Sequence, residues 1–354
     1  MKFQKEMMNK FKKNTALCFD DILLVPQHSD IDSRRSVDLK MNIGKNLSLS
    51  LPVIAAPMDT VCEIKMAIEL YKAGGIGIIH RFMPIEDQVS QIRLAVSDHG
   101  VKNIGGSIGA KGDYVSDALR IEEAGATVIL VDTANGHSSY AIDAVKTLRS
   151  VLKTSTHIMA GNVATGEGYK ALSEAGADSV RVGIGGGGVC VTRLVSGHGV
   201  PLLSSVMDCK KVKEKYSLNT AIIADGGIRN SGDMIKAFAG GADAVMVGSI
   251  LAGTEESPGS TFINSTGKYK TYRGMASSEA NKGKDIAVAE GVSTLIPFKG
   301  SVSEVLKDIK GGLGSGCSYS GVTKLLDIYE NAMYVEVSQA SLGESKPHAS
   351  GLNV

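Results

Sequence analysis

A cysteine stands at the end of a glycine run. The segment GIGGGGVCVTR occupies residues 183–193 and places Cys190 two residues before Thr192. Successive glycines let backbone amides converge on an anion or a planar ring. A thiol among backbone N–H groups can have a lowered pKa and act as a nucleophile. No Gly-Lys-Ser/Thr follows, so the segment is not a P-loop, and its loose match to GxGxxG is weak evidence by itself.

The alternative for any single cysteine is a small buried side chain. We assign that role to the four other cysteines, Cys18, Cys62, Cys209 and Cys317. Cys190 differs from them because its loop follows a predicted strand and because Thr192 lies nearby in the sequence. We therefore predict that Cys190 is a nucleophile.

Two glycine turns further along the chain suit a phosphate. The sequences Ala-Asp-Gly-Gly at 224–227 and Val-Gly-Ser at 247–249 each end a predicted strand. In phosphate-binding barrels, the turns after strands seven and eight cradle the phosphate with N–H groups. Asp225 could accept hydrogen bonds from ribose hydroxyls. Either turn alone could simply cap its strand, but both in this order favour a nucleotide site.

A third polar turn, Asp-Thr-Ala-Asn-Gly-His-Ser at 132–138, ends another predicted strand. Asp132 could bind a second ribose or an amide there, whereas the alternative is the capped start of a helix at Ser138. His137 in this turn, and His80 after an earlier strand, stay open between a functional and a structural role.

These turns must be positioned by strands, and the chain has eight short apolar runs that predict them. The predicted strands occupy residues 52–58, 75–79, 103–108, 127–132, 156–161, 179–183, 221–225 and 244–247. Three similar segments, at 123–132, 174–183 and 239–248, are each typical of a helix ended by glycine and a buried strand. Eight strands separated by helical stretches favour an α/β fold, a (β/α)8 barrel, over a doubly wound sheet. The polar turns then gather at the C-terminal face, where barrels carry active sites.

An extra segment follows the eighth strand. Residues 261–272 predict a hairpin around the turn at 264–267. Residues 276–291 are polar with little periodicity and predict a mobile flap. No break in composition marks a second domain, so we predict that residues 1–354 form a single barrel domain, with the hairpin and flap at 261–291 inserted after strand eight.

Composition excludes several classes of protein. The 354 residues carry a net charge of +1, which argues against a nucleic-acid partner, and the 42 glycines show no collagen period. No apolar run approaches the roughly 20 residues that a membrane helix needs. The basic start at 1–14 lacks the apolar core of a secretory signal, and we expect it to fray. Five cysteines without a C-x-x-C pair support neither a zinc knuckle nor a disulfide framework, so we expect a cytoplasmic protein.

Several motifs together resemble the IMP dehydrogenase / GMP reductase family over nearly the whole chain. They are the Cys190 loop, Asp-Gly-Gly at 225–227, CFDDILLVP at 18–26, APMDT at 56–60, GSILAGTEESPG at 248–259 and YRGM at 272–275. The resemblance implies a homotetrameric (β/α)8 barrel acting at C2 of a purine 5′-monophosphate. It implies that the thiolate of Cys190 attacks C2 to form a covalent thioimidate, while Thr192 and Glu290 manage protons.

The same resemblance implies which residues contact the ligands. Those for the substrate are Met58, Gly188, Asp225, Gly227, Gly248, Ser249, Tyr272, Gly274, Met275 and Ala276. Those for the nicotinamide cofactor are Asp132, Thr133, Asn162 and Arg181. A potassium ion could be bound by the backbone carbonyls of Gly183, Gly185 and Cys190.

The flap bears on which reaction the resemblance implies. IMP dehydrogenase hydrolyses its thioimidate with water activated by an Arg-Tyr pair on the flap, whereas GMP reductase needs no such water. Residues 276–291 read ASSEANKGKDIAVAEG and contain no Arg-Tyr pair. Residues 275–279, Asn135 and residues 317–319 also look reductase-like. We therefore expect a GMP reductase, which converts GMP to IMP and ammonia with NADPH.

Other segments favour the dehydrogenase. Residues 248–259, 334–337 and 342–345 look more like IMP dehydrogenase. The alternative is thus an IMP dehydrogenase without a regulatory domain, which converts IMP, NAD and water to XMP.

The glycine loop also departs from the family pattern. Gly186 and Gly188 stand where the family usually has Pro and Ser, which removes a phosphate-binding hydroxyl. A divergent paralogue acting on a modified purine nucleotide is a further alternative. The contrasting class is a non-catalytic nucleotide-binding protein. The presence of Cys190, Thr192 and Glu290 together argues against that class.

Overall fold

The computed structural model describes residues 15–277, 279–280 and 288–345. The segment at 1–14 that the sequence predicts to fray lies outside these residues, as does the central part of the flap predicted at 276–291. Within the described ranges, we find no helix with the length and apolar character needed to cross a membrane.

Eight parallel strands close into a barrel, which confirms the predicted (β/α)8 fold. The strands are β4 (Val53–Ala55), β5 (Ile76–Ile79), β6 (Gly105–Ile108), β7 (Val128–Asp132), β8 (His157–Val163), β9 (Ser179–Val182), β10 (Ala221–Asp225) and β11 (Ala244–Val247). The closed order is β10-β11-β4-β5-β6-β7-β8-β9, so neighbours in the barrel follow one another in sequence. The barrel closes where β11 pairs with β4, with Val247 opposite Ala55.

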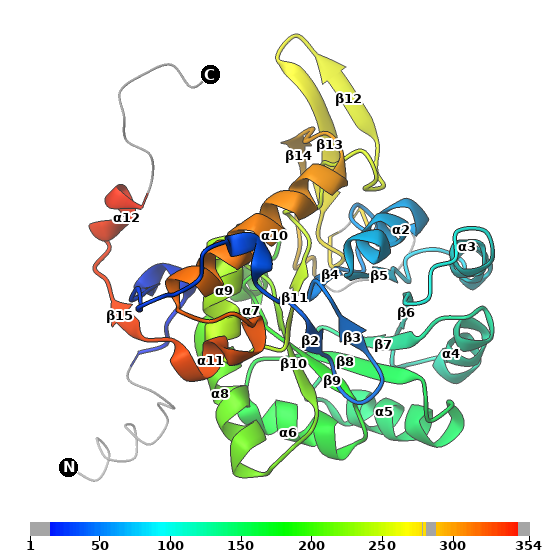
Figure 1. Cartoon of the computed structure of the whole chain (residues 1–354). Coiled ribbons are helices and arrows are strands. Elements are labelled where there is room, and N and C mark those ends of the chain that lie inside the picture. The colour runs from blue at the N-terminus through cyan, green and yellow to red at the C-terminus, as the bar shows by residue number, and fades with distance from the viewer. Residues whose placement is uncertain (1–14, 278, 281–287, 346–354) are drawn as a thin grey trace.

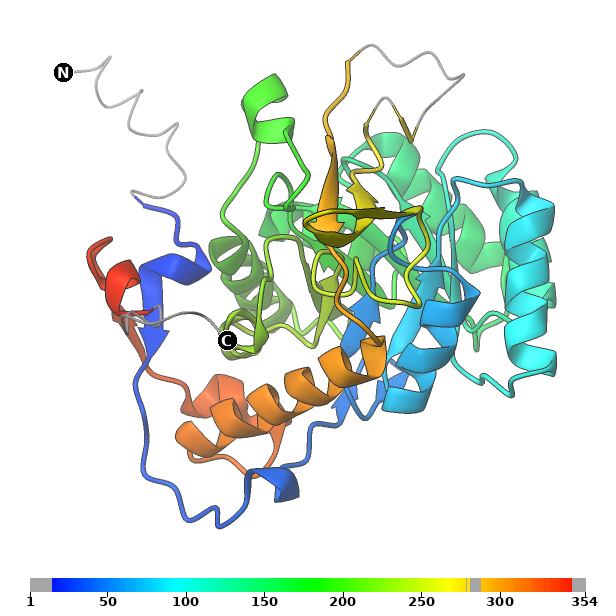
Figure 2. The ribbon, with the colours of Figure 1, turned by 90° about the horizontal axis from the view of Figure 1, so that it is seen from above.

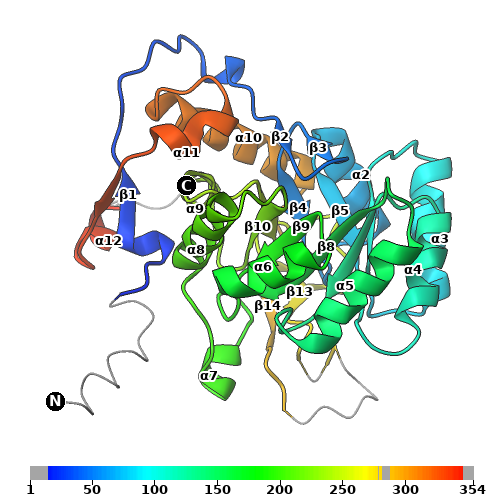
Figure 3. The ribbon, with the colours of Figure 1, turned by 90° about the horizontal axis from the view of Figure 1, so that it is seen from below.

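Helices connect these strands and cover the outside of the barrel (Figure 3). They are α2 (Ile64–Ala73), α3 (Ile85–Ser97), α4 (Tyr114–Glu123), α5 (Ser139–Val151), α6 (Gly166–Glu174), α8 (Leu202–Lys215), α9 (Ser231–Ala239) and the later α10 (Val302–Tyr319). Side chains just before the first turn cap three of them, the third being Ser301 before α10. Thr165 accepts a hydrogen bond from the amide of Gly168 in α6, and Asn230 accepts one from the amide of Asp233 in α9.

The three repeated segments form the same joint three times, between α4 and β7, α6 and β9, and α9 and β11. Each joint contains a glycine in the left-handed region, with φ of 104° at Gly125, 104° at Gly176 and 101° at Gly241. A residue with a Cβ rarely adopts this conformation, so glycine lets each helix end and the chain turn back into a strand. The strands that follow are buried on both faces, as the valine-rich sequences predict.

A three-stranded antiparallel sheet follows the barrel. β12 (Thr261–Asn264) and β13 (Gly267–Arg273) form a hairpin, with Asn264 opposite Gly267. This hairpin projects away from the rest of the ribbon (Figure 1). A third strand, β14 (Ser293–Pro297), pairs with β13 and was absent from the predicted elements.

The remaining elements are short. They are η1 (Phe19–Asp21), β1 (Ile22–Leu24), η2 (Arg34–Ser36), β2 (Met41–Asn42), β3 (Ser48–Leu49), α7 (Thr192–Ser196), η3 (Leu325–Asp327), α11 (Ile328–Asn331), β15 (Tyr334–Glu336) and α12 (Ser341–Glu344). β2 pairs with β3, and β1 pairs with β15, which joins segments from near the two ends of the chain. α7 stands out from the ring of helices (Figures 2 and 3) and begins directly after Cys190 and Val191.

Candidate functional site

The residues singled out from the sequence surround one cavity of about 390 Å³ at the C-terminal ends of the barrel strands. This volume is in the usual range for a small-molecule site. Each predicted site residue lines it: Met58, Asp132, Thr133, Asn162, Arg181, Gly183, Gly185, Gly188, Cys190, Thr192, Asp225, Gly227, Gly248, Ser249, Tyr272, Gly274, Met275, Ala276 and Glu290. Residues from distant parts of the chain therefore meet in one pocket.

Cys190 lies at the end of the glycine loop that follows β9. The loop turns sharply, with φ of 142° at Gly183 and 82° at Gly185, and the amide of Cys190 donates to the carbonyl of Gly187 at 3.1 Å. The Cys190 Sγ atom donates a hydrogen bond to Oγ1 of Thr192 at 3.2 Å. The thiol thus faces the cavity with a hydroxyl as its hydrogen-bond partner.

The end of the flap pairs with the cysteine loop. The amide of Val191 donates to the carbonyl of Glu290 at 2.9 Å, and the amide of Val292 donates to the carbonyl of Val189 at 3.0 Å. These bonds place Cys190 opposite Gly291 in a short antiparallel bridge. The backbone therefore holds Glu290 beside the cysteine loop.

The turns after β10 and β11 form one end of the cavity. Gly227 has a φ of 73°, a conformation that favours glycine. A Cβ on Gly248 would lie 3.2 Å from the hydroxyl oxygen of Tyr272, so this glycine lets the backbone approach the phenol closely. Burial, and then the charge of Asp225, raise the pKa of Tyr272 to about 12. Tyr272 therefore keeps its proton at neutral pH and can donate a hydrogen bond.

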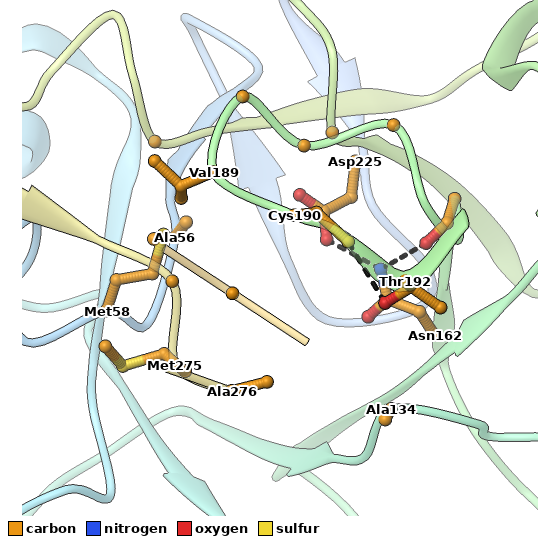
Figure 4. Close-up of a pocket in the computed structure, with 18 of the residues that line it drawn as sticks. Ala56, Met58, Ala134, Asn162, Val189, Cys190, Thr192, Asp225, Met275 and Ala276 are labelled. Carbon is orange, nitrogen blue, oxygen red and sulfur yellow. Dashed lines mark hydrogen bonds between the residues drawn. The ribbon is translucent and has the colours of Figure 1, made fainter. Parts of the chain in front are cut away.

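The opposite wall of the cavity carries two methionines. Figure 4 shows Met58 and Met275 on one side of the cavity and Cys190, Asp225 and Asn162 on the other. The amide of Asp59 donates to the sulfur of Met275 at 3.4 Å, which ties the start of the flap to the turn after β4. Polarizable thioethers suit contact with a flat aromatic ring.

The residues predicted for the cofactor are held by hydrogen bonds to one another and to the barrel. The Thr133 hydroxyl donates to the carbonyl of Gly161 at 2.8 Å. The amide of the Asn162 side chain donates to Asp225 at 2.7 Å and to the carbonyl of Gly183 at 2.8 Å. Asn162 therefore contacts a residue that the resemblance assigns to the substrate, and it lies between the two predicted subsites.

Two charged or aromatic residues of the cavity lining, Arg81 and Phe82, were missed by the sequence analysis. Arg81 and Phe82 follow β5 and line the pocket. The Arg81 guanidinium lies 4.9 Å from the centre of the Phe82 ring, and its Nε donates to Asp132 at 3.2 Å. Their only sequence signal is their place directly after a predicted strand. A cation and an aromatic ring here fit a ligand that carries phosphates and flat rings.

The two histidines left open by the sequence lie outside the cavity lining. His80 is buried, with Nε2 at 3.2 Å from a carboxylate oxygen of Glu63 and Nδ1 accepting from the amide of Phe82 at 3.1 Å. His137 is exposed, and its amide donates to the side chain of Asn135. Both positions therefore favour a structural role.

The metal prediction rests on backbone carbonyls. In the part of the chain that the structure describes, no three His, Cys, Asp or Glu side chains are grouped so as to hold a metal ion. The carbonyl of Gly183 already accepts a hydrogen bond from Asn162. A potassium ion on Gly183, Gly185 and Cys190 stays a prediction.

Comparison with known proteins gives consistent matches over most of the chain. The model of the IMP dehydrogenase / GMP reductase domain matches residues 16–348. GMP reductase from Leishmania major is 33% identical, covering 94% of this chain and 96% of that protein. Inosine-5′-monophosphate dehydrogenase from Cryptosporidium parvum is 37% identical, covering 94% of this chain and 95% of that protein.

A solved structure gives the same result. A GMP reductase variant from Trypanosoma brucei, crystallised with guanosine 5′-monophosphate, has a TM-score of 0.90 and 30% sequence identity to this chain. The match covers 96% of this chain and 99% of that one. Both activities thus occur among the proteins that match.

Proposed function

The chain belongs to the IMP dehydrogenase / GMP reductase family, and we propose that it converts GMP to IMP and ammonia with NADPH, as a GMP reductase does. Members of this family are purine nucleotide oxidoreductases. The observation that carries the finer proposal is the composition of the flap, since residues 276–291 contain neither arginine nor tyrosine. The flap therefore offers no Arg-Tyr pair to activate water, whereas reductive deamination requires no water at C2.

In this proposal Cys190 performs the covalent step. Its thiolate adds to C2 of GMP, and the C2 amino group leaves as ammonia once it has gained a proton, which leaves a thioimidate on the purine. When bound, the nicotinamide cofactor supplies a hydride to C2. Departure of the thiolate then gives IMP and free Cys190. The balance is GMP, NADPH and two protons to IMP, ammonium and NADP+.

Thr192 and Glu290 are proposed to move the protons. The Thr192 hydroxyl lies 3.2 Å from the sulfur of Cys190, close enough to exchange a proton with it. Glu290 lines the same cavity, and its backbone is paired with the residue after Cys190. Their place in the cavity lining supports a role for both groups in protonating the leaving amino group.

The other wall residues are proposed to bind and orient. Asp225 would accept from the ribose, while Gly227, Gly248, Ser249 and Tyr272 would bind the phosphate. Gly188 would supply only a backbone N–H there. Gly274 and Ala276 would line the purine end beside the two methionines, Met58 and Met275. All of these residues line the cavity.

The cofactor would bind beside Arg81 and Phe82. Asp132 and Thr133 would hold the ribose next to the nicotinamide, so that the ring lies over C2 of the purine. The cation and aromatic ring of these two residues fit the phosphates and the flat rings of such a cofactor. Binding of NADPH rather than NAD, assembly into a homotetramer and binding of potassium belong to the same proposal.

A second candidate is IMP dehydrogenase, which would oxidise IMP to XMP with NAD and water. The identity of 37% to the dehydrogenase from Cryptosporidium parvum favours it, as does the sequence at 248–259. This candidate requires a group other than an Arg-Tyr pair on the flap to activate the water.

The two candidate reactions change the absorbance of the reduced nicotinamide cofactor in opposite directions, because one consumes the reduced cofactor and the other forms it. The purified protein should consume NADPH when GMP is added and should produce no NADH from IMP and NAD. Formation of NADH without any consumption of NADPH would identify a dehydrogenase. No change in either reaction would favour a paralogue that acts on a modified purine nucleotide, or a nucleotide-binding protein without activity.

A further inference from the structure

Arg181 lies between the two halves of the cavity. It belongs to β9, and its side chain is 9% exposed. Its Nη1 donates to Oδ1 of Asp132 at 2.7 Å, while Nη2 and Nε donate to Oδ2 of Asp225 at 2.9 and 3.2 Å. One buried guanidinium therefore holds a carboxylate of the proposed cofactor half and a carboxylate of the proposed substrate half at once.

These hydrogen bonds use the carboxylate oxygens unequally. Oδ2 of Asp225 accepts twice from Arg181 and once from Asn162, whereas its Oδ1 has no hydrogen-bond partner in the described part of the chain. Both oxygens of Asp132 are engaged, Oδ1 by Arg181 and Oδ2 by Arg81. A ribose hydroxyl can approach Oδ1 of Asp225 without displacing a protein group, and Arg181 determines where that oxygen points.

Arg181 also balances the charges of the two carboxylates. Burial opposes the charged form of Asp132, but the guanidiniums of Arg181 and Arg81 outweigh burial and lower its pKa. In turn, the carboxylates of Asp225 and Asp132 outweigh burial and raise the pKa of Arg181. Without the guanidinium, the two half-buried carboxylates would lose the cation that both of them contact.

We propose that Arg181 is a positioning residue that couples the two subsites. A purine nucleotide bound at Asp225 would then increase the affinity of the cofactor subsite, which contains Asp132, for the nicotinamide cofactor. The inference rests on the proposed function, which supplies the two ligands. A planar guanidinium with hydrogen bonds on both edges cannot shift toward one carboxylate without stretching its bonds to the other. Fixing Asp225 by a bound ribose thereby fixes Asp132, and the coupling is reciprocal.

A different role for Arg181 is direct contact with a ligand through its remaining N–H groups. The two roles predict different behaviour in a double-mutant cycle. If Arg181 acts through Asp225, Arg181→Gln causes no further loss of GMP affinity once Asp225→Asn is present. If Arg181 contacts GMP itself, the two losses add.

The test measures binding without turnover, by calorimetric titration of GMP into the full chain with and without saturating NADP+. The wild type should bind GMP about tenfold more tightly when NADP+ is present. Arg181→Gln should bring that ratio to about one, and Arg181→Lys, which keeps the charge but loses the planar fork, should restore part of it. Asp132→Asn should also lower the ratio to about one, because it removes the charge through which Arg181 holds the cofactor side.

Arg149→Lys is the matched control, because Arg149 also bonds a buried carboxylate, that of Asp178, away from the cavity. The Arg149→Lys protein should keep the wild-type ratio of GMP affinities with and without NADP+. Its melting temperature measures how much stability the fold loses when an arginine–aspartate pair is weakened. A wild type that binds both ligands without coupling, or an Arg181→Gln protein that keeps the coupling, would overturn the inference. A wild type that binds neither ligand would overturn the proposed function itself, and the inference with it.

Discussion

At the scale of single residues, the chemistry depends on where the sulfur of Cys190 points. Its hydrogen bond to Thr192 and the backbone bonds of its loop hold the thiol toward the cavity. In the proposed mechanism, a hydroxyl at this distance relays the thiol proton to a base such as Glu290 when the thiolate forms, and relays it back later. This hydrogen bond is the reason that we propose Thr192 for the same step as the cysteine.

Removing either group should affect kcat more than nucleotide binding. Cys190→Ala should abolish turnover while GMP still binds, because the phosphate and ribose contacts do not involve the sulfur. Thr192→Val should lower kcat about a hundredfold, the usual scale of a proton-transfer group. Steady-state kinetics and GMP titrations measure both effects.

Thr147→Val provides the control for the threonine substitution, since the Thr147 hydroxyl bonds the carbonyl of Asp143 within α5 and does not line the cavity. Its kcat should equal that of the wild type. Normal turnover by Cys190→Ala would rule out a covalent intermediate at this position.

The sequence could predict Cys190 because its signal is local: a glycine run, a preceding strand and a nearby hydroxyl within eleven residues. Arg81 could not be predicted in this way. Its importance comes from a hydrogen bond to Asp132, on a strand two places away in the barrel. Arginines directly after strands are common, and nothing in the neighbouring sequence distinguishes this one.

At the scale of elements, the site depends on three segments that pack backbone against backbone. The amide of Gly274 donates to the carbonyl of Val292 at 3.0 Å, and Val292 in turn bonds Val189 in the cysteine loop. Gly291 lies at the centre of this packing. Backbone hydrogen bonds therefore link the residue after β13, the end of the flap and the cysteine loop.

Gly291→Ala should disturb the nucleophile through the backbone. The added Cβ would lie 3.1 Å from the amide nitrogen of Ser277 and 3.2 Å from Cα of Gly274, and backbone atoms cannot rotate away. We expect a loss of stability of about 1–3 kcal/mol. We also expect kcat to fall, by less than the roughly hundredfold that a 1 Å displacement costs, because relieving these contacts shifts the backbone by only a few tenths of an ångström.

The control is Gly311→Ala, where an added Cβ in α10 meets no atom within 4 Å. It should leave kcat unchanged and stabilise the helix by about 0.5–1 kcal/mol. Melting curves and initial rates of both variants separate the two effects. Wild-type kcat in Gly291→Ala would show that the flap does not position the cysteine loop.

Most of the barrel strands were predictable as elements because they are short runs rich in valine or isoleucine that are buried on both faces. β14 was not predictable, since its residues are mostly exposed and its place is set only by pairing with β13 across the flap. Pairing between distant segments leaves no periodic pattern in the sequence.

At the scale of the whole molecule, the two ends of the barrel differ in the residues that they hold. The C-terminal ends of the strands carry the cavity, whereas the N-terminal end of β8 holds a buried histidine, His157. Its Nε2 lies 2.7 Å from the hydroxyl of Ser179, and its Nδ1 has no partner among the described residues. Burial lowers the pKa of His157 to about 4, with the charges of Asp178 and Arg149 acting in opposite directions.

This histidine should make the fold less stable in acid. The unfolded chain binds its proton near pH 6.5, whereas the folded chain does so only near pH 4. The free energy of unfolding should therefore fall as the pH drops from 6.5 toward 4, by up to about 1.4 kcal/mol per pH unit. Urea unfolding at several pH values measures this slope.

His157→Gln should reduce that slope, since glutamine does not titrate. His99→Gln, at an exposed histidine, should leave it unchanged. An unchanged slope in His157→Gln would mean that carboxylates alone cause the acid sensitivity.

The positions of the glycines in the whole barrel explain why the sequence is rich in glycine. Turns such as Gly183, Gly185 and Gly227, all with positive φ, lie at the rim of the cavity, while Gly125 and Gly176 end helices elsewhere in the barrel. The sequence could predict both uses because each glycine stands at a strand or helix boundary. It could not predict that Arg181 joins two of the strands across the cavity, because that depends on the closed barrel.

The central claim is reductive deamination of GMP through Cys190, and the most direct measurement of it is ammonia released per NADPH oxidised. With GMP and NADPH, the wild-type protein should release ammonia and consume NADPH in equimolar amounts. Cys190→Ala should do neither. NADH formation from IMP and NAD, or NADPH oxidation without ammonia, would contradict the claim.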